Sequence, residues 1–255
     1  MCGRYELHSH PAAIALAFGL AQTPELAPRY NIAPMQQVPV VRTGAHGARE
    51  LALVRWGLVP RWARDPSIGA KMINARGETL REKPAFRTAY RRHRCLVPAD
   101  GVYEWMALPG GGKQPMHIAM ADGRPFAFAG LTERWLGPDG EPLDTCTIVT
   151  TGANALLAPV HDRMPVIVAS DDYARWLDPG VDDPADLVAP APADRMSVRP
   201  VSTRVNNVRH DDPSLIVAVD AAPPESPDVR PAAATPGEAD AGAPPSKRSR
   251  QSALF

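Results

Sequence analysis

Cysteine is the second residue of the chain, so removal of Met1 would make Cys2 the N-terminal residue. Its α-amine and thiol would then lie on one two-carbon unit, with ordinary pKa values of about 7.7–8.0 and about 8.5. A 1,2-aminothiol of this kind captures aldehydes, because the amine forms an imine and the thiol then closes a five-membered thiazolidine. The same terminus could instead serve an N-terminal nucleophile hydrolase, whose amine is the base for the thiol. The third interpretation is a buried cysteine without a chemical role.

Short apolar runs between Pro and Gly residues predict the elements that must position this terminus. Such runs, rich in β-branched or aromatic residues, are typical of strands, and they lie at 38–42, 51–60, 94–105, 115–121, 125–131, 145–151 and 164–169. Helices are expected at 11–21, with Ser9 near the N-cap, and at 84–92, 153–158 and 171–177. We therefore expect an α+β fold dominated by antiparallel sheet, in which the glycines at 110–112 form a hairpin loop.

Composition narrows the class of protein. The 255 residues include 28 Lys and Arg and 28 Asp and Glu, so the formal net charge is zero, and 44% are hydrophobic, as in ordinary globular proteins. The 29 prolines exclude a helical bundle, because Pro breaks helix interiors. Arg outnumbers Lys by 24 to 4, which favours bidentate binding of phosphate or carboxylate, although a GC-rich genome would have the same effect.

The zero net charge hides two segments of opposite sign. Residues 55–94 carry a net charge of +8, and residues 170–194 carry −6. A basic segment can bind a polyanion even in a neutral chain, because fields are screened within about 8 Å in physiological salt. The alternative is a solvated surface with internal ion pairs, and charge alone does not separate the two.

Three widely spaced cysteines and the lack of a C-x-x-C motif argue against a disulfide framework or a zinc finger. We expect Cys95 and Cys146 to be small buried residues, and we expect neither a metal nor another cofactor. No apolar run reaches about 18 residues, so no transmembrane helix is expected. Residues 221–255 are rich in Pro and Ala and poor in large apolar side chains, which predicts a disordered tail.

Longer motifs follow one another along the chain. They read MCGRY (1–5), RYNIAP (29–34), WGLVPRWA (56–63), INARGET (73–79), KPAFR (83–87), RCLVPADGVYEW (94–105), FAGLTERW (128–135), TCTIVTTGAN (145–154) and HDRMPVIV (161–168). In order and wording they resemble the SOS-response-associated peptidase (SRAP) family, the abasic-site-processing proteins. The resemblance covers 1–220, which it marks as a catalytic domain, and it implies a largely antiparallel β barrel-like core with flanking helices.

The resemblance also implies a function. Family members lose Met1, by a removal suspected to be autocatalytic, and use the new N-terminal cysteine to capture the aldehyde of an abasic site in single-stranded DNA. The thiazolidine cross-link shields the lesion from strand cleavage during replication. Two other functions stay open from the residues alone. They are a cysteine peptidase that acts on other proteins and a non-covalent binder of single-stranded DNA.

The resemblance assigns catalytic roles to four residues. Cys2 is the nucleophile. Glu104, in GVYEW, would assist sugar ring opening and imine formation, and its apolar neighbours should raise the pKa of its carboxyl. His161, in HDRMP, would transfer protons, and Asn74, in INAR, would hold the Cys2 amine or a sugar hydroxyl.

Contacts to DNA are expected from arginines and aromatic rings, because a single strand binds in a cationic groove with its bases stacked on aromatic faces. The family match places Arg76, Arg163, Trp62 and Trp105 among these contacts, and Arg4 is tied to the reactive terminus. Asn31 and Pro39 are further candidates to line the groove. If the chain is extended there, Asn74 and Arg76 share one face, and so do His161 and Arg163.

The chain ends in QSALF, which resembles the short C-terminal peptides that bacterial polymerases and repair proteins use to bind the sliding clamp. The sequence therefore suggests that Gln251, Leu254 and Phe255 recruit the protein to the replication clamp. We expect a monomer without a membrane partner, located in the bacterial cytoplasm near the nucleoid.

Overall fold

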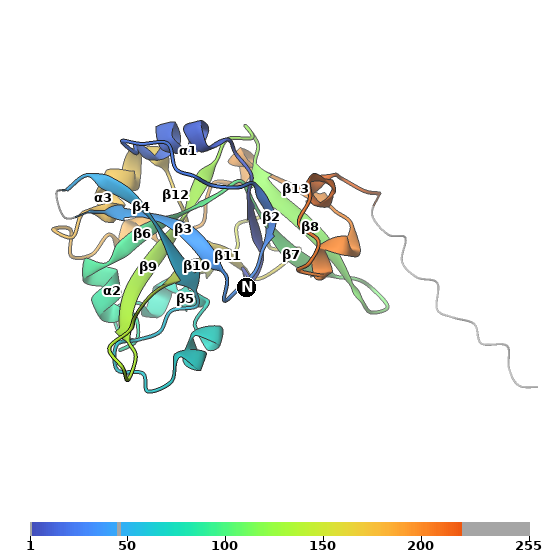
Figure 1. Cartoon of the computed structure of the whole chain (residues 1–255). Coiled ribbons are helices and arrows are strands. Elements are labelled where there is room, and N and C mark those ends of the chain that lie inside the picture. Colours follow the sequence, from blue (N-terminus) through green and yellow to red (C-terminus); the bar gives the residue numbers. More distant parts are fainter. Residues whose placement is uncertain (1, 45–46, 221–255) are drawn as a thin grey trace, which may run out of the picture. The chain divides into compact units, whose positions relative to one another are not determined.

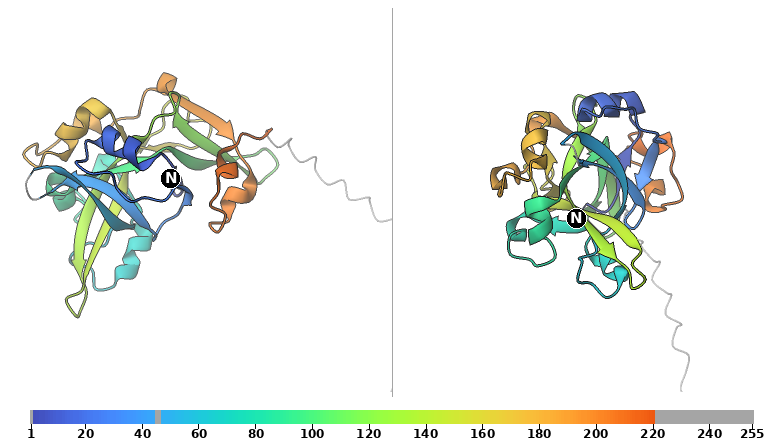
Figure 2. Two further views of the ribbon diagram at one scale, coloured as in Figure 1. Left: turned by 45° about the horizontal axis from the view of Figure 1, so that its top comes forward. Right: turned by 60° about the vertical axis from the view of Figure 1, so that its left-hand side comes forward.

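A closed five-stranded barrel forms the centre of this computed structural model, which describes residues 2–44 and 47–220 (Figures 1 and 2). Its strands pair in the order β4–β3–β6–β9–β10, and β10 pairs back with β4. All contacts around this ring are antiparallel except that between β10 and β4. The strands are β3 (Gln37–Thr43), β4 (Arg49–Trp56), β6 (Arg94–Ala99), β9 (Phe126–Leu136) and β10 (Pro142–Gly152).

A second, five-stranded antiparallel sheet has the order β13–β8–β7–β1–β2. Glycines 110–112 connect β7 to β8, and all three have positive φ, between 81° and 105°, which side chains other than glycine rarely adopt. The predicted hairpin loop is therefore confirmed. The strands are β1 (Tyr5–Leu7), β2 (Arg29–Ile32), β7 (Gly101–Ala107), β8 (Lys113–Met120) and β13 (Met196–Pro200).

Three short strands extend the barrel sheet beside the end of β10. β5 (Asn74–Arg76) pairs with β10 in parallel, and β11 (Arg163–Pro165) pairs with its last residues in antiparallel fashion. β12 (Ile167–Val168) adds to β9. The α+β class and the largely antiparallel barrel are thus as predicted.

Within the described residues, three helices flank the sheets: α1 (Pro11–Phe18), α2 (Arg87–Arg92) and α3 (Tyr173–Leu177). α2 and α3 both contact β6, which explains why every residue of β6 is buried. None of the described helices combines the length and hydropathy needed to cross a membrane. The short 3-10 helices are Pro66–Lys71, Gly77–Thr79, Ser170–Asp172, Ala185–Leu187, Ala193–Arg195, Thr203–Asn206 and Pro213–Ile216.

The prediction of a helix at 153–158 was wrong. Residues 153–158 form turns, because Asn154 accepts the Leu157 amide with its side chain at 2.9 Å and Pro159 follows soon after. The N-cap of α1 is His10, whose Nδ1 accepts the Ala12 amide at 3.2 Å. Ser9 is not available as a cap, because Asp100 accepts both its amide and its hydroxyl, each at 2.6 Å.

The core of the barrel contains packed aromatic rings. Tyr5 packs edge-on against Trp56 and Phe128, with ring centroids 5.4 and 5.7 Å apart. Cys95 and Cys146 have no exposed surface, as predicted, and all three cysteines are free thiols. Tyr5 is only three residues from Cys2. The packing of its ring in the barrel core therefore fixes the position of the nearby Cys2.

The two charged segments of the sequence meet in the fold. Arg81 pairs with Asp183 at 2.5 Å, and the buried Arg94 donates to the carbonyls of Trp176, Asp178 and Val181. Part of the basic segment is therefore neutralised within the protein, which confirms the interpretation of internal ion pairs for this part.

By its contacts the chain divides into two units, Met1–Pro224 and Glu225–Phe255, and all described residues belong to the first. The predicted disordered tail, 221–255, lies outside the described residues. So do the proposed clamp-binding residues, Gln251, Leu254 and Phe255.

Candidate functional site

The N-terminal segment joins the two sheets. On one side, the Tyr103 amide of β7 donates to the Arg4 carbonyl at 2.9 Å. On the other, Asn74 Nδ2 of β5 donates to the Cys2 carbonyl at 2.7 Å. Cys2 belongs to the main hydrophobic core and has no exposed surface. The residue that could carry an aminothiol is thus held at a junction built from distant parts of the chain.

Charges on Glu104 and His161 influence the ionisable groups around Cys2. Burial raises the pKa of the Cys2 thiol well above its ordinary value, and the negative charge of Glu104 raises it further. Glu104 is only 4% exposed, so burial also raises the pKa of its carboxyl, while positive charge on His161 acts in the opposite direction. The structure therefore brings together Cys2, Asn74, Glu104 and His161, the four predicted catalytic residues. Their roles in catalysis stay predictions.

His161 has two neighbours at one ring nitrogen. Nδ1 accepts the Arg163 amide at 2.9 Å, and it lies 2.9 Å from the Asp162 carboxylate. One nitrogen cannot accept and donate at once, so Nδ1 can satisfy only one of these two neighbours at a time.

Arg4 connects the terminus to a second cluster of predicted DNA contacts. Its Nη1 donates to the Asn31 side chain at 2.8 Å and to the Val205 carbonyl at 2.7 Å, and its guanidinium lies 5.8 Å from the centre of the Trp105 ring. Asn31 is 1% exposed and donates to the carbonyls of residues 205, 207 and 210. The Asn31 amide therefore fastens the 203–210 segment, and it is already saturated with hydrogen bonds.

Trp105 and Trp62 differ in their surroundings. Trp105 is half-buried and donates from Nε1 to Asn206 Oδ1 at 2.7 Å, so its ring is held in place. Trp62 lies on a turn after β4 and is 60% exposed, which leaves an aromatic face open to solvent. Pro39 is buried within β3, opposite Leu53 of β4, so its ring does not reach the surface of the folded protein.

Arg76 and Arg163 flank the end of β10. β5 is extended, with Ala75 buried and Arg76 exposed, so Asn74 and Arg76 share a face as expected. β11 starts only at Arg163 and Asp162 lies in a bend, so His161 and Arg163 do not lie together on a strand. The guanidinium of Arg163 forms a double ion pair with Glu78, at 2.5 and 2.9 Å.

Sequence reasoning missed a buried contact between a glutamate and a histidine beside the site. Glu6 of β1 and His117 of β8 are 1% and 2% exposed, and Glu6 Oε1 lies 2.7 Å from His117 Nε2. Gly101 lies between them on β7, where a Cβ would be 2.4 Å from the histidine nitrogen and 2.6 Å from the carboxylate. In the sequence, only Gly101 could have indicated this contact, because the close approach of Glu6 and His117 to β7 requires a residue without a side chain.

His117→Leu is expected to lower the free energy of unfolding by about 1–3 kcal/mol, because Glu6 loses its shortest buried hydrogen bond. Urea denaturation at pH 7 measures the loss. The double variant Glu6→Gln with His117→Leu is the control, and it should recover a large part of the stability. Equal instability of the single and double variants would show that packing, and not the unsatisfied carboxyl, is responsible.

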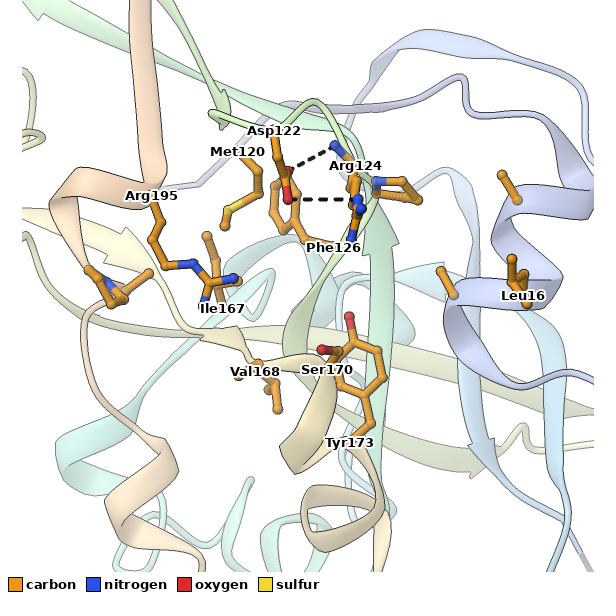
Figure 3. Close-up of a pocket in the computed structure, with 16 residues that line it drawn as sticks. Leu16, Met120, Asp122, Arg124, Phe126, Ile167, Val168, Ser170, Tyr173 and Arg195 are labelled. Atoms are coloured by element: carbon orange, nitrogen blue, oxygen red, sulfur yellow. Dashed lines mark hydrogen bonds and ion pairs between the residues drawn. The ribbon is translucent and has the colours of Figure 1, made fainter.

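A cavity of about 620 Å³ is lined by residues of α1, β9, β12 and α3, among others (Figure 3). Its walls include Leu16, Phe126 and Val168, with Arg124 paired to Asp122 at one side. None of the residues predicted for catalysis or DNA contact lines it. In the part of the chain that the structure describes, no group of three or more His, Cys, Asp or Glu side chains could hold a metal ion.

The same fold is found in solved structures. A protein from Bacteroides thetaiotaomicron superposes with a TM-score of 0.77 at 26% identity, over 86% of this chain and 100% of its own. A protein from Bordetella bronchiseptica gives a TM-score of 0.70 at 30% identity, over 79% of this chain and 100% of its own. The chain belongs to the SOS response associated peptidase (SRAP) family, whose model matches residues 1–208.

Its relatives within the family have more specific names. Abasic site processing protein YoqW of Bacillus subtilis is 44% identical over 223 residues, which are 85% of this chain and 99% of YoqW. Abasic site processing protein HMCES of Gallus gallus is 33% identical over 269 residues, which are 88% of this chain and 80% of that protein. The predicted family membership is thus confirmed.

Proposed function

We propose that this protein processes abasic sites in single-stranded DNA by capturing their aldehyde on Cys2 after Met1 has been removed. The observation that carries the proposal is the position of Cys2, whose carbonyl is held by Asn74 while its thiol lies in the electrostatic field of Glu104. The abasic-site-processing relatives supply the substrate class. Removal of Met1 is required chemically, because the Cys2 nitrogen is otherwise part of a peptide bond.

The proposed reaction condenses one aldehyde with one aminothiol and releases one water. The Cys2 amine adds to C1 of the open-chain sugar to give a carbinolamine. Protonation of its hydroxyl expels water and leaves an iminium ion. The thiol sulfur then adds to the same carbon and loses its proton, which closes the thiazolidine ring. Because burial keeps the thiol protonated, the amine reacts first and the sulfur second.

We assign the proton transfers of this sequence to Glu104. A carboxyl with a raised pKa can donate a proton to the departing hydroxyl and can take back the thiol proton afterwards. The abasic sugar exists mainly as a closed hemiacetal, and its opening needs the same donor and acceptor. We assign His161 to relay this proton to solvent, since its ring is partly exposed and has a carboxylate neighbour. Asn74 fixes the Cys2 backbone and does not exchange protons.

The proposed DNA contacts divide into open and supporting residues. Arg76 and Trp62 are exposed, so they are free to meet a phosphate and a base. Arg4 and Trp105 hold each other next to the terminus, and Arg163 meets the strand only after leaving its carboxylate partner. Asn31 and Pro39 are buried, so we assign them supporting roles. Asn31 holds the 203–210 segment by hydrogen bonds, and Pro39 packs within β3.

The test uses the full-length protein and an oligonucleotide with one abasic site. After heating, a denaturing gel should show a slowly migrating cross-link, and intact mass should equal protein without Met1 plus DNA minus one water. A tetrahydrofuran analogue, which has no aldehyde, is the control and should not cross-link. A shift seen only on native gels would instead indicate a non-covalent binder. Cleavage of added peptides without any cross-link would favour a peptidase.

A further inference from the structure

The guanidinium of Arg163 is occupied by an internal carboxylate. Nη1 and Nη2 donate to the two oxygens of Glu78 at 2.5 and 2.9 Å, in the parallel geometry in which arginine binds carboxylate or phosphate. Nη2 also donates to the Thr150 carbonyl at 2.8 Å. The two nitrogens that a phosphate would need are therefore already bound.

Glu78 is part of the same surface as the proposed DNA contacts. It lies in the 3-10 helix Gly77–Thr79, directly after the strand that carries Asn74 and Arg76. Arg76 is close enough for its charge to lower the pKa of the Glu78 carboxyl, although the hydrogen bond from Arg163 lowers it more. Glu78 is therefore ionised at neutral pH, and it competes with phosphate at all times.

The exposure of the two partners shows which one can move. Arg163 is 18% exposed and Glu78 is 53% exposed. The carboxylate can turn into solvent, whereas Arg163 has a second bond, to the Thr150 carbonyl, that does not involve Glu78. Release of Glu78 would thus free the two N–H groups that it occupies on an arginine still bound to Thr150.

We infer that Glu78 is a specificity-determining residue that covers Arg163 and weakens reversible binding of undamaged single-stranded DNA. A phosphate gains Arg163 only by displacing Glu78, so each encounter with an intact strand is short. An abasic strand suffers the same competition but is then retained by the covalent bond. This inference rests on the proposed function for its biological meaning, although the competition itself can be measured without any cross-link.

The test measures reversible binding of a labelled, undamaged oligonucleotide. Fluorescence anisotropy gives its affinity at several salt concentrations. Glu78→Gln is expected to tighten binding by about three- to tenfold. The slope of log affinity against log salt should also become steeper by ~0.7, the value for one further phosphate contact on a single strand. Glu82→Gln is the matched control, because this exposed neighbour loses the same charge without touching Arg163. It should change affinity much less.

A double-mutant cycle separates uncovering of Arg163 from a general change of charge. In an Arg163→Gln background, the gain from Glu78→Gln should vanish, because no guanidinium remains to be released. Thermal unfolding of each variant confirms that it is folded. The inference is overturned if Glu78→Gln binds no more tightly than Glu82→Gln, or if its gain survives without Arg163. Failure of the wild type to cross-link abasic DNA would overturn the proposed function only.

Discussion

Cys2→Ser is expected to abolish the heat-stable cross-link to abasic DNA. Serine retains the α-amine, so an imine can still form, but its hydroxyl closes only an oxazolidine, which hydrolyses readily. Borohydride should therefore trap a Cys2→Ser adduct that disappears when the reductant is left out. Denaturing gels with and without borohydride measure both species. This pattern would distinguish the amine step from the sulfur step within one active site.

The control for Cys2→Ser is Cys95→Ala. Cys95 is as deeply buried as Cys2, and the pKa of its thiol is likewise raised by burial, but it lies on β6 within the barrel. Its replacement should leave the cross-link yield unchanged, once thermal unfolding has shown that the variant folds. A heat-stable adduct of Cys2→Ser formed at the wild-type rate, without reductant, would contradict the proposed chemistry.

Glu104→Gln is expected to slow cross-link formation by about 10²- to 10⁴-fold, the usual contribution of a positioned acid or base. The rate should also lose part of its pH dependence. Burial raises the pKa of Glu104, so the wild-type carboxyl keeps its proton to a higher pH than an ordinary glutamate and then loses it. The wild-type rate should fall as pH rises through that raised pKa, while the glutamine variant has no proton to lose. Single-turnover rates across pH measure the difference.

Stability provides a check on the Glu104 experiment. A carboxyl whose pKa is raised by folding binds its proton more tightly in the folded state, so its ionisation destabilises the fold as pH rises through the raised value. Glu104→Gln removes this cost and should be no less stable than wild type at neutral pH. Glu133→Gln, at a buried glutamate of β9, is the control and should keep the wild-type rate. A Glu104→Gln variant as fast as wild type would exclude Glu104 from proton transfer.

The sheets were predictable because strands leave a local signature. Runs such as 38–42 and 145–151 are short, β-branched and bounded by turn residues, and they became β3 and β10. Closure of the barrel was not predictable from these runs. It depends on two residue pairs, Thr145 with Arg55 and Cys146 with Trp56, and parallel pairing between segments about 90 residues apart leaves no local pattern.

The residues of the candidate site were predictable from the sequence, but the side chains that pair with them were not. Family motifs indicated Cys2 and Glu104, whereas nothing near Arg163 in the sequence shows that Glu78 binds it 85 positions away. The same holds for the Glu6–His117 pair, whose members are 111 positions apart. Charged side chains attract any opposite charge that the fold brings near, so their pairing is decided by tertiary structure.

The junction of the two sheets has a consequence for when the protein becomes reactive. Asn74, which holds the Cys2 carbonyl, is 72 positions away in the chain, and His161 is further still. Contacts between such distant positions form late, because the entropy of closing long loops must first be overcome. A nascent chain therefore carries Cys2 without the hydrogen bond from Asn74 and without the field of Glu104. Under the proposed function, completed folding would supply positioning and proton transfer at Cys2, although an N-terminal aminothiol reacts with aldehydes without either.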